Sequence, residues 1–288
     1  MSGAIHLKPF EVRAVDIDQS GRIQPVVFLD YLLESASEQA ARFDIGVTDL
    51  FKKGRTWVLS RLHVEFDRFP AWGESLTIET WPSAKLPLYA IRDFAVFNDR
   101  GPAARATSSW LIVDLETRRP VRMAEHLDDF PLDGRRAVED DFAPLPSPAR
   151  EDARKEFPVF FSDLDINRHF TATAYIHRAL ETVPREILFE LRPVSIEVNF
   201  RAEAFYGDVI VSRLERIEAA GGAAGPRLLP RLSRADADKE LTLLRTPCAR
   251  PPPARRPPGT PSTQRKPPHG CPALLPPAIP GRSPGRLP

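Results

Sequence analysis

The chain has 288 residues, of which 42% are hydrophobic and 27% charged, a composition that supports one large or two small globular domains. No stretch approaches the roughly 18 to 20 apolar residues of a membrane span, and the N-terminus lacks the pattern of a secretion signal, so we expect a cytoplasmic protein. The two cysteines, Cys248 and Cys271, lack the close partners that a zinc site or a redox pair requires, so neither disulfides nor a cysteine nucleophile are expected.

The formal net charge of +1 conceals an uneven distribution along the chain. Residues 247–288 contain seven Lys or Arg, no acidic residue and 15 of the 31 prolines, whereas the remaining 246 residues carry 33 basic and 39 acidic groups. An acidic folded part gives no reason to expect nucleic acid as a partner. Because so much proline prevents helices and sheet pairing, we predict a disordered tail over 247–288, with an out-of-frame end as the alternative.

In chain order, the first predicted domain covers residues 1–136. A short strand and an acidic loop precede a helix predicted over 26–43, where apolar residues recur at helical spacing. Runs with the character of strands then follow one another, and "NDRG" forms a turn between the last two. These predicted strands are 56–66, 74–82, 88–98 and 104–115.

A linker predicted over 137–154 leads to the second predicted domain, residues 155–246. This domain repeats the order of the first, with a helix over 171–183 followed by strands at 194–200, 208–218, 227–235 and 239–246. One helix followed by sequential strands predicts an α+β architecture, in which an antiparallel sheet folds over a single helix.

Two sequence blocks recur in the same order in both domains. "DIDQSGRIQPVVFLDYLLE" aligns with "DLDINRHFTATAYIHRALE", which sets Asp16 on Asp163 and Asp18 on Asp165. "LHVEFDRFPAWGE" aligns with "IEVNFRAEAFYGD", with a glycine shared near the end of each. Few identities are involved, but two blocks in one order indicate a tandem duplication.

The stretch "SDLDINRH" carries Asp163, Asp165, Asn167 and His169 at alternate positions in front of the second helix. Polar side chains at such a place can accept the free N–H groups of the first helical turn. For Asp163, and for Thr171 at the helix entrance, this capping role is the better interpretation. For His169, packing and function are both open.

The same stretch resembles the start of a calcium-binding loop, because oxygen-bearing side chains occupy its first, third and fifth positions. Such a loop needs glycine at the sixth position and a bidentate glutamate at the twelfth, and this chain has Arg168 and Ala174 there. Calcium is therefore not expected.

The two copies differ at three polar positions. Asn167 and His169 replace Ser20 and Arg22 of the first copy, and Glu203 replaces Phe69. A carboxylate is costly to bury without a purpose, so the differences point to a polar site confined to the second domain.

With these residues in view, the chain resembles the bacterial acyl-acyl-carrier-protein (acyl-ACP) thioesterases, a double hotdog family that includes the plant fatty acyl-ACP thioesterases. "SDLDINRH" is similar to the family's Ser-Asp-(Leu/Met)-Asp-x-Asn-x-His signature, and "TWVLSRLHVEFDRFPAWGESLTIETWP" and "VNFRAEAFYGD" resemble its other blocks. The resemblance covers about 8–246. It implies a tandem hotdog fold, each half an antiparallel sheet wrapped around one long helix, with acyl-chain binding in the first domain and catalysis in the second.

Carried over by motif, the catalytic residues that the resemblance implies are Asp165, Asn167, His169 and Glu203, with no metal and no cofactor. The plant enzymes have a cysteine directly after the glutamate, whereas this chain has Ala204, which excludes a covalent cysteine mechanism here. The implied reaction is hydrolysis of acyl-ACP to free fatty acid and holo-ACP by carboxylate-activated water. Either Glu203 or Asp165 is the base, and Asn167 and the helix N-terminus polarise the carbonyl. His169 orients the water or a carboxylate, or protonates the leaving thiolate.

Other assignments stay open at this level. An acyl-CoA thioesterase of the same fold and a non-catalytic acyl-thioester binding protein are the alternatives. A dehydratase of this fold is disfavoured because the first helix has no histidine and the second has only His177. The implied partner is an acyl carrier protein that carries a fatty acyl chain, and a homodimer is a compatible assembly. Basic residues that could contact the acidic carrier, although a solvated surface role is the simpler one, are Arg42, Lys52, Lys53, Arg55 and Arg61.

Overall fold

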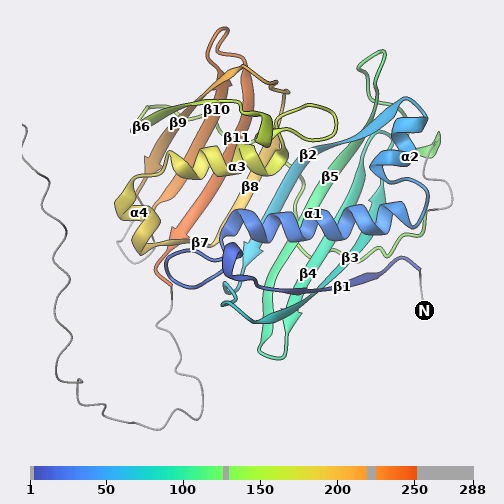
Figure 1. The fold of residues 1–288 in the computed structure, drawn as a ribbon, viewed down its shortest axis with the longest axis horizontal. Helices are drawn as coiled ribbons and strands as arrows, with labels where there is room; N and C mark the ends of the chain where they lie inside the picture. The colour runs from blue at the N-terminus through green and yellow to red at the C-terminus, as the bar shows by residue number, and fades with distance from the viewer. Residues whose placement is uncertain (1–2, 126–129, 219–224, 252–288) are drawn as a thin grey trace, which may run out of the picture. The chain divides into compact units, whose positions relative to one another are not determined.

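The two halves of the chain join edge to edge through their central strands. In the computed structural model, which describes residues 3–125, 130–218 and 225–251, strand β2 (Arg55–Phe66) pairs antiparallel with β8 (Ser195–Phe200). The register sets His63 opposite Glu197, with Arg61 opposite Asn199 and Glu65 opposite Ser195 on either side. This ladder makes one continuous sheet from strands of both halves (Figure 1).

The order of strands is the same on both sides of that junction. Moving outward from β2, the first half contributes β5, β4, β3 and β1, and from β8 the second half contributes β11, β10, β9 and β6. All these neighbours pair antiparallel, and the two-residue strand β7 adds to β11. The bounds are β1 His6–Glu11, β3 Ser75–Lys85, β4 Ala90–Asn98, β5 Gly101–Asp114, β6 Ala153–Pro158, β7 Arg192–Pro193, β9 Val209–Ile217, β10 Arg227–Arg234 and β11 Glu240–Ala249.

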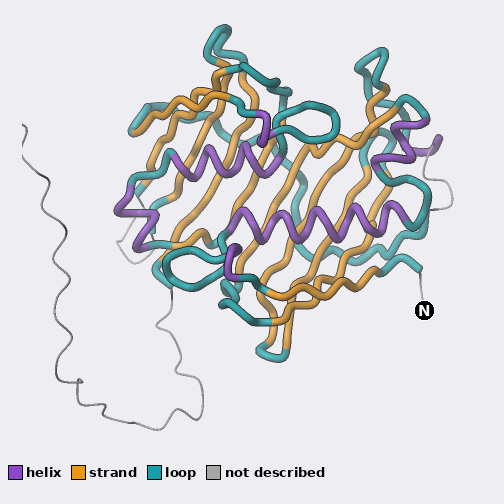
Figure 2. The backbone as a smooth tube through the Cα atoms, in the orientation of Figure 1, coloured by secondary structure: helices purple, strands orange, loops and turns teal. Residues whose placement is uncertain are grey.

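Each half lays one main helix across the same face of the sheet. Helix α1 (Pro25–Ala41) begins with a proline at its first position, where the missing N–H would have had no acceptor in the helix. Helix α3 (Ala172–Glu181) is its counterpart in the second half, and Figures 1 and 2 show both crossing the strands on one side. Two short helices, α2 (Val47–Lys52) and α4 (Arg185–Glu190), follow the main ones. Among the described residues, no helix is both long enough and apolar enough to cross a membrane.

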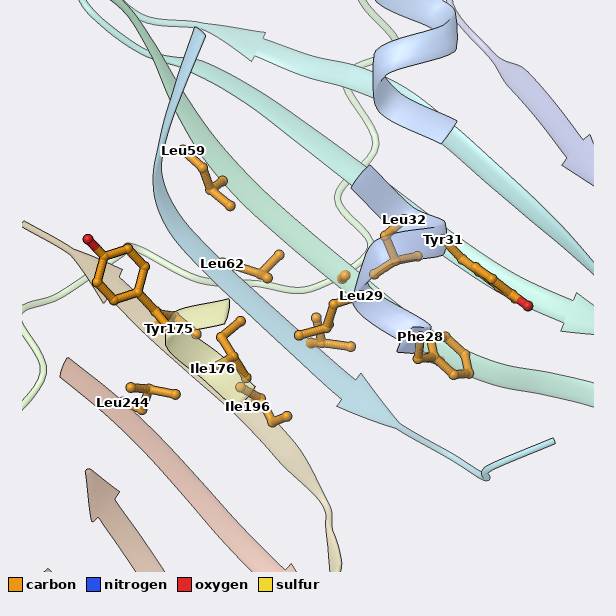
Figure 3. Packing of buried hydrophobic residues seen from close by; sticks show 14 of the residues in the cluster. Phe28, Leu29, Tyr31, Leu32, Leu59, Leu62, Tyr175, Ile176, Ile196 and Leu244 are labelled. Atoms are coloured by element: carbon orange, nitrogen blue, oxygen red, sulfur yellow. The ribbon is translucent and has the colours of Figure 1, made fainter. Parts of the chain in front are cut away.

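The core lies between the two main helices and the sheet. Figure 3 shows Leu29 of α1 and Ile176 of α3 packing with Leu62 of β2, Ile196 of β8 and Leu244 of β11. These side chains are all at most 2% exposed. One apolar cluster therefore spans both halves.

The α+β double hotdog architecture expected from the sequence is confirmed, since the strands of each half pack against one main helix. Short helices α2 and α4 were not predicted, because six residues are too few to establish a helical period. Strand β11 continues to Ala249, so the predicted start of the tail at 247 is too early. Pro247 pairs with β10, and Cys248 and Ala249 pair with β7, which keeps these residues in the sheet. The rest of the predicted tail, residues 252–288, lies outside the described residues.

Candidate active site

The loop in front of α3 has the same backbone hydrogen bonds as the loop in front of α1. In the second half, Asp165 N–H donates to the His169 carbonyl at 2.8 Å, and Phe170 N–H donates to Ala204 at 2.9 Å. The first half repeats these bonds from Asp18 to Arg22 and from Ile23 to Pro70, at 2.9 Å each. The residues correspond through the two sequence blocks, so the duplication inferred from the sequence extends to individual hydrogen bonds.

The loop turns through one residue with left-handed backbone. That residue is Gly21 in the first half, at φ +71°, and Arg168 in the second, at φ +61°. Glycine adopts this conformation freely, whereas a residue with a Cβ atom pays a conformational cost. The loop of the second half therefore keeps its shape at some expense in backbone energy.

Asp163 and Thr171 have structural roles. Thr171 is the N-cap of α3, and its hydroxyl accepts the Ala174 N–H at 3.2 Å. Asp163 accepts the Phe160 N–H at 3.0 Å and pairs with Arg178 of α3 at 3.1 Å. Its counterpart Asp16 likewise accepts the N–H three residues earlier.

Asp165 organises the loop with its carboxylate. One oxygen, Oδ1, accepts the backbone N–H groups of Asn167 and His169 at 2.8 and 3.0 Å. The other, Oδ2, accepts the Asn167 side-chain amide at 3.2 Å. Three donors therefore converge on Asp165 from the two residues that differ between the halves.

His169 faces Glu203 across the loop. The imidazole Nδ1 lies 3.3 Å from Glu203 Oε1, and the His169 side chain is 13% exposed. The Phe205 ring meets the imidazole edge to face, with centroids 5.2 Å apart. A carboxylate at Nδ1 favours the tautomer with its proton on Nδ1, which leaves Nε2 as a proton acceptor.

Asn167 presents its amide between Asp165 and the interior. The hydrogen bond from Nδ2 to Asp165 fixes which end of the amide is the donor. The amide oxygen Oδ1 is buried and has no hydrogen-bond partner among the described residues. Nδ2 carries a second N–H, so this side chain offers one donor and one acceptor to a bound molecule.

The first half has Asp18, Ser20 and Arg22 at the positions of Asp165, Asn167 and His169, and these residues make different contacts. Asp18 accepts the Ser20 N–H and hydroxyl at 2.8 and 2.7 Å and pairs with Arg192 of the second half. The Arg22 guanidinium donates to the Phe69 carbonyl at 3.0 Å. The first half thus conserves the loop but has neither the imidazole nor the second carboxylate.

All four predicted catalytic residues line one cavity of about 450 Å³. Its wall comes from both halves, with strands β2 and β5 of the first half opposite the loop and helix of the second. Ala172, the first residue of α3, also lines the cavity, and the first N–H groups of a helix lack acceptors within it. The described residues of the first half in the wall are Trp57, Val58, Leu59, Ser60, Leu111, Val113, Arg118 and Pro120.

Arg118, which the sequence analysis missed, reaches the site from the first half. Its guanidinium pairs with Glu203 Oε2, while Oε1 of the same carboxylate faces His169. Arg118 lies in the turn after β5, at φ +60°. Nothing in the local sequence marks it, because only the pairing of β2 with β8 brings this turn to the second half.

Tyr175 was also missed. It lies on the buried face of α3, lines the cavity, and donates its hydroxyl to the Ala202 carbonyl at 3.2 Å. Burial raises the pKa of this phenol above its ordinary value. Tyr175 therefore acts as a neutral wall residue that also fixes the backbone beside Glu203.

Other candidate groups lie away from the cavity. Burial raises the pKa of the Cys248 thiol to about 12, so this sulfur is protonated at neutral pH. None of the five basic residues considered as carrier contacts is among the described residues that line the cavity.

One group of potential metal ligands also lies outside the cavity. Ligand atoms of His63, Asp140 and Glu197 lie within 4.8 Å of one another. Both carboxylates already have partners, since Asp140 contacts His63 at 2.7 Å and Glu197 pairs with Arg245.

Comparison with protein-family models gives two matches that together cover most of the chain. Residues 3–129 match the acyl-ACP thioesterase N-terminal domain, and residues 147–241 match the acyl-ACP thioesterase C-terminal domain.

Several curated plant proteins have similar sequences. A chloroplastic oleoyl-acyl carrier protein thioesterase from Coriandrum sativum is 29% identical over 171 residues, which are 54% of this chain and 46% of that protein. A chloroplastic palmitoyl-acyl carrier protein thioesterase from Cuphea hookeriana is 26% identical over 240 residues, 77% of this chain and 57% of that protein. The chain thus spans about half the length of the curated relatives that it matches.

Solved structures share the fold over nearly their whole length. An acyl-ACP thioesterase from Bacteroides thetaiotaomicron aligns with a TM-score of 0.74 at 24% identity, covering 85% of this chain and 97% of that one. The 12:0-ACP thioesterase from Umbellularia californica aligns with a TM-score of 0.77 at 21% identity, covering 86% and 94%.

Proposed function

Since this chain belongs to the acyl-ACP thioesterase family, we propose that it hydrolyses the thioester of an acylated acyl carrier protein to free fatty acid and holo-ACP. The observation that carries the proposal is the approach of His169 to Glu203 in the wall of a cavity that Asn167 and the start of α3 also line. A thioester carbonyl in this cavity would meet a base and hydrogen-bond donors together.

In the proposed reaction, Nε2 of His169 takes a proton from water as the water oxygen bonds to the thioester carbon. Glu203 holds the imidazole by Nδ1 and stabilises the imidazolium that forms, as a carboxylate does in a hydrolytic triad. Asp165 is less suited to be the base, because three N–H donors already occupy its oxygens.

The tetrahedral intermediate then needs donors for its oxyanion. The second N–H of the Asn167 amide and the backbone N–H groups at the start of α3 are suited to this role. When the C–S bond breaks, the imidazolium returns its proton to the thiolate of the carrier's prosthetic arm. The hydrolysed acyl group leaves as the fatty acid, whose carboxyl proton passes to solvent, and no covalent enzyme intermediate forms.

The acyl carrier protein is the partner we propose, and the cytoplasm is the compartment. Arg118, Arg201, Arg234 and Lys239 line the cavity, and the three arginines pair with acids of this chain, namely Glu203, Glu240 and Asp236. The family match is therefore the support for the carrier protein as partner.

The test is hydrolysis by the full chain of acyl-ACPs and acyl-CoAs of graded chain length, with free fatty acid as the readout. We expect release from acyl-ACP, and a loss of about 10²-fold or more in Asn167→Ala, His169→Ala and Glu203→Ala with folding retained. An exposed acid on α4 provides the control, and Glu186→Gln should match the unmodified protein.

Wild-type turnover in all three alanine variants would remove the proposed roles. Release from acyl-CoAs alone would favour the CoA thioesterase, and binding of acyl thioesters without any release would favour the non-catalytic alternative.

A further inference from the structure

A second, smaller cavity lies behind the catalytic one, and a single side chain borders both. The smaller cavity, about 60 Å³, lies between the C-terminal part of α1 and strands β2 to β5 of the first half. Trp57 of β2 lines this cavity and also the 450 Å³ cavity that holds the candidate active site. The Trp57 indole is therefore a partition between the two spaces.

Trp57 is held in place from two directions. Its Nε1–H donates to the Ile45 carbonyl at 2.7 Å, in the segment that joins α1 to α2. The Trp110 ring of β5 meets the indole edge to face, with centroids 6.4 Å apart and an interplanar angle of 84°. Because an indole with a bonded N–H and a packed ring has little freedom to rotate, Trp57 keeps its place in the walls of both cavities.

The space behind the partition suits a hydrocarbon chain. Small side chains, Ala36 and Ala40 of α1 and Ala90 of β4, leave the room, and Val47 and Trp110 add apolar surface. Arg92 also lines this cavity, and its guanidinium is already bonded to Gln39 and Thr80. A cavity with such a lining does not hold water well, so it gains more from methylene groups than from solvent.

We propose that Trp57 sets the length of acyl chain that the enzyme accepts, by closing the catalytic cavity against the apolar space along α1. This inference rests on the proposed function, because it takes the ligand to be an acyl thioester. The thioester end lies at His169, the chain runs toward the first half, and its terminal carbons stop at the indole.

Removing the indole should join the two cavities. Each additional methylene that leaves water improves binding roughly fourfold, so two more carbons give on the order of tenfold. For Trp57→Ala we expect the ratio of kcat/KM for acyl-ACPs longer than the wild-type optimum to kcat/KM for shorter ones to rise about tenfold. Trp57→Leu is the second variant, because it opens the partition while keeping more apolar packing.

Refilling the space behind the partition is the matched control. In a Trp57→Ala protein, Ala40→Leu should remove the gain for long chains, since the added side chain occupies the smaller cavity. Ala40→Leu alone should leave the wild-type profile unchanged, because the closed partition keeps substrate out of that cavity.

The outcomes separate this inference from the proposed function. An active wild-type protein whose chain-length profile is the same in folded Trp57→Ala and Trp57→Leu variants would overturn the role of Trp57 alone. A gain that persists after Ala40→Leu would also overturn it, since the chain would then run elsewhere. Absence of release from every thioester by the wild-type protein would instead overturn the proposed function.

Discussion

At the scale of single residues, the two carboxylates of the site differ in what surrounds them. Asp165 is surrounded by N–H donors of its own loop, and it shapes the loop. Glu203 stands between an imidazole and a guanidinium that come from different segments, with one oxygen toward each. The sequence alone leaves the base open between these two carboxylates, and their contacts favour a third arrangement, with His169 as the base and Glu203 as its orienting partner.

Substitution of Arg118 tests whether Glu203 orients His169. It pairs with Glu203, so we expect it to act as a positioning residue that keeps the carboxylate aligned with His169. Arg118→Gln should lower kcat about tenfold with little change in KM, and Arg118→Lys should restore part of the loss because the charge is kept. The neighbour Arg119, which is not among the described residues lining the cavity, provides the control as Arg119→Gln.

The pH dependence of kcat distinguishes a positioning role of Arg118 from a role in the stability of the fold alone. Loss of the guanidinium should change the pH dependence of kcat, since it removes the positive charge that pairs with Glu203, the carboxylate that faces His169. An Arg118→Gln protein with wild-type kcat and pH profile would contradict the role.

At the scale of elements, each main helix is anchored at its start by an acid, Asp16 in the first half and the less buried Asp163 in the second. In the first half, hydrogen bonds from the Arg13 guanidinium hold the pKa of Asp16 at about 2, below its ordinary 3.8. Asp16 is 2% exposed and also accepts the Tyr31 hydroxyl of α1. Anchors of this kind fix where the helix begins relative to strand β1.

The lowered pKa of Asp16 predicts acid sensitivity. A group whose folded pKa is depressed stabilises the fold above its unfolded pKa, and this stabilisation disappears as the pH falls from about 4 toward 2. The contribution at neutral pH is on the order of 2 kcal/mol. Urea unfolding at pH 7, 4 and 3 should show Asp16→Asn to be less stable at pH 7 and less dependent on pH across that interval. Parallel pH dependence in both proteins would exclude this role for Asp16.

The sequence predicted the parts of the site that lie close together in the chain. Asp165, Asn167 and His169 share one loop, so their spacing was enough, and Glu203 was found because the duplicated block offered Phe69 for comparison. The main helices and the strands were predictable from their apolar periods. Arg118 and Trp57 could not be found in this way, because their place in the site depends on the β2 and β8 register, a long-range property that no local pattern encodes.

At the scale of the whole molecule, the two halves have similar folds but contribute different residues to the candidate active site. The cavity with His169 and Glu203 uses the loop of the second half and the strands of the first. The corresponding loop of the first half carries Ser20 and Arg22 and is tied to the second half by Arg192. We therefore expect one active site in each chain.

Matched substitutions in the two loops test that expectation. Ser20→Ala and Arg22→Ala should leave kcat within about twofold of wild type, because neither residue lines the candidate active site. Asn167→Ala and His169→Ala, at the corresponding positions, should each lose about 10²-fold or more. Rates should be compared well below the unfolding temperature of every variant, and equal losses from both loops would refute a single site.

Two ion pairs that join the halves of the chain limit which halves of related proteins can be combined. Arg118 of the first half pairs with Glu203 of the second, and Arg192 of the second half pairs with Asp18 of the first. A chimera that takes its two halves from different relatives would separate each arginine from the carboxylate it evolved with. Such a hybrid can keep every strand and helix and still lose the alignment of its catalytic carboxylate. Successful exchange of halves should therefore require both arginine–carboxylate couples to be transferred intact across the junction.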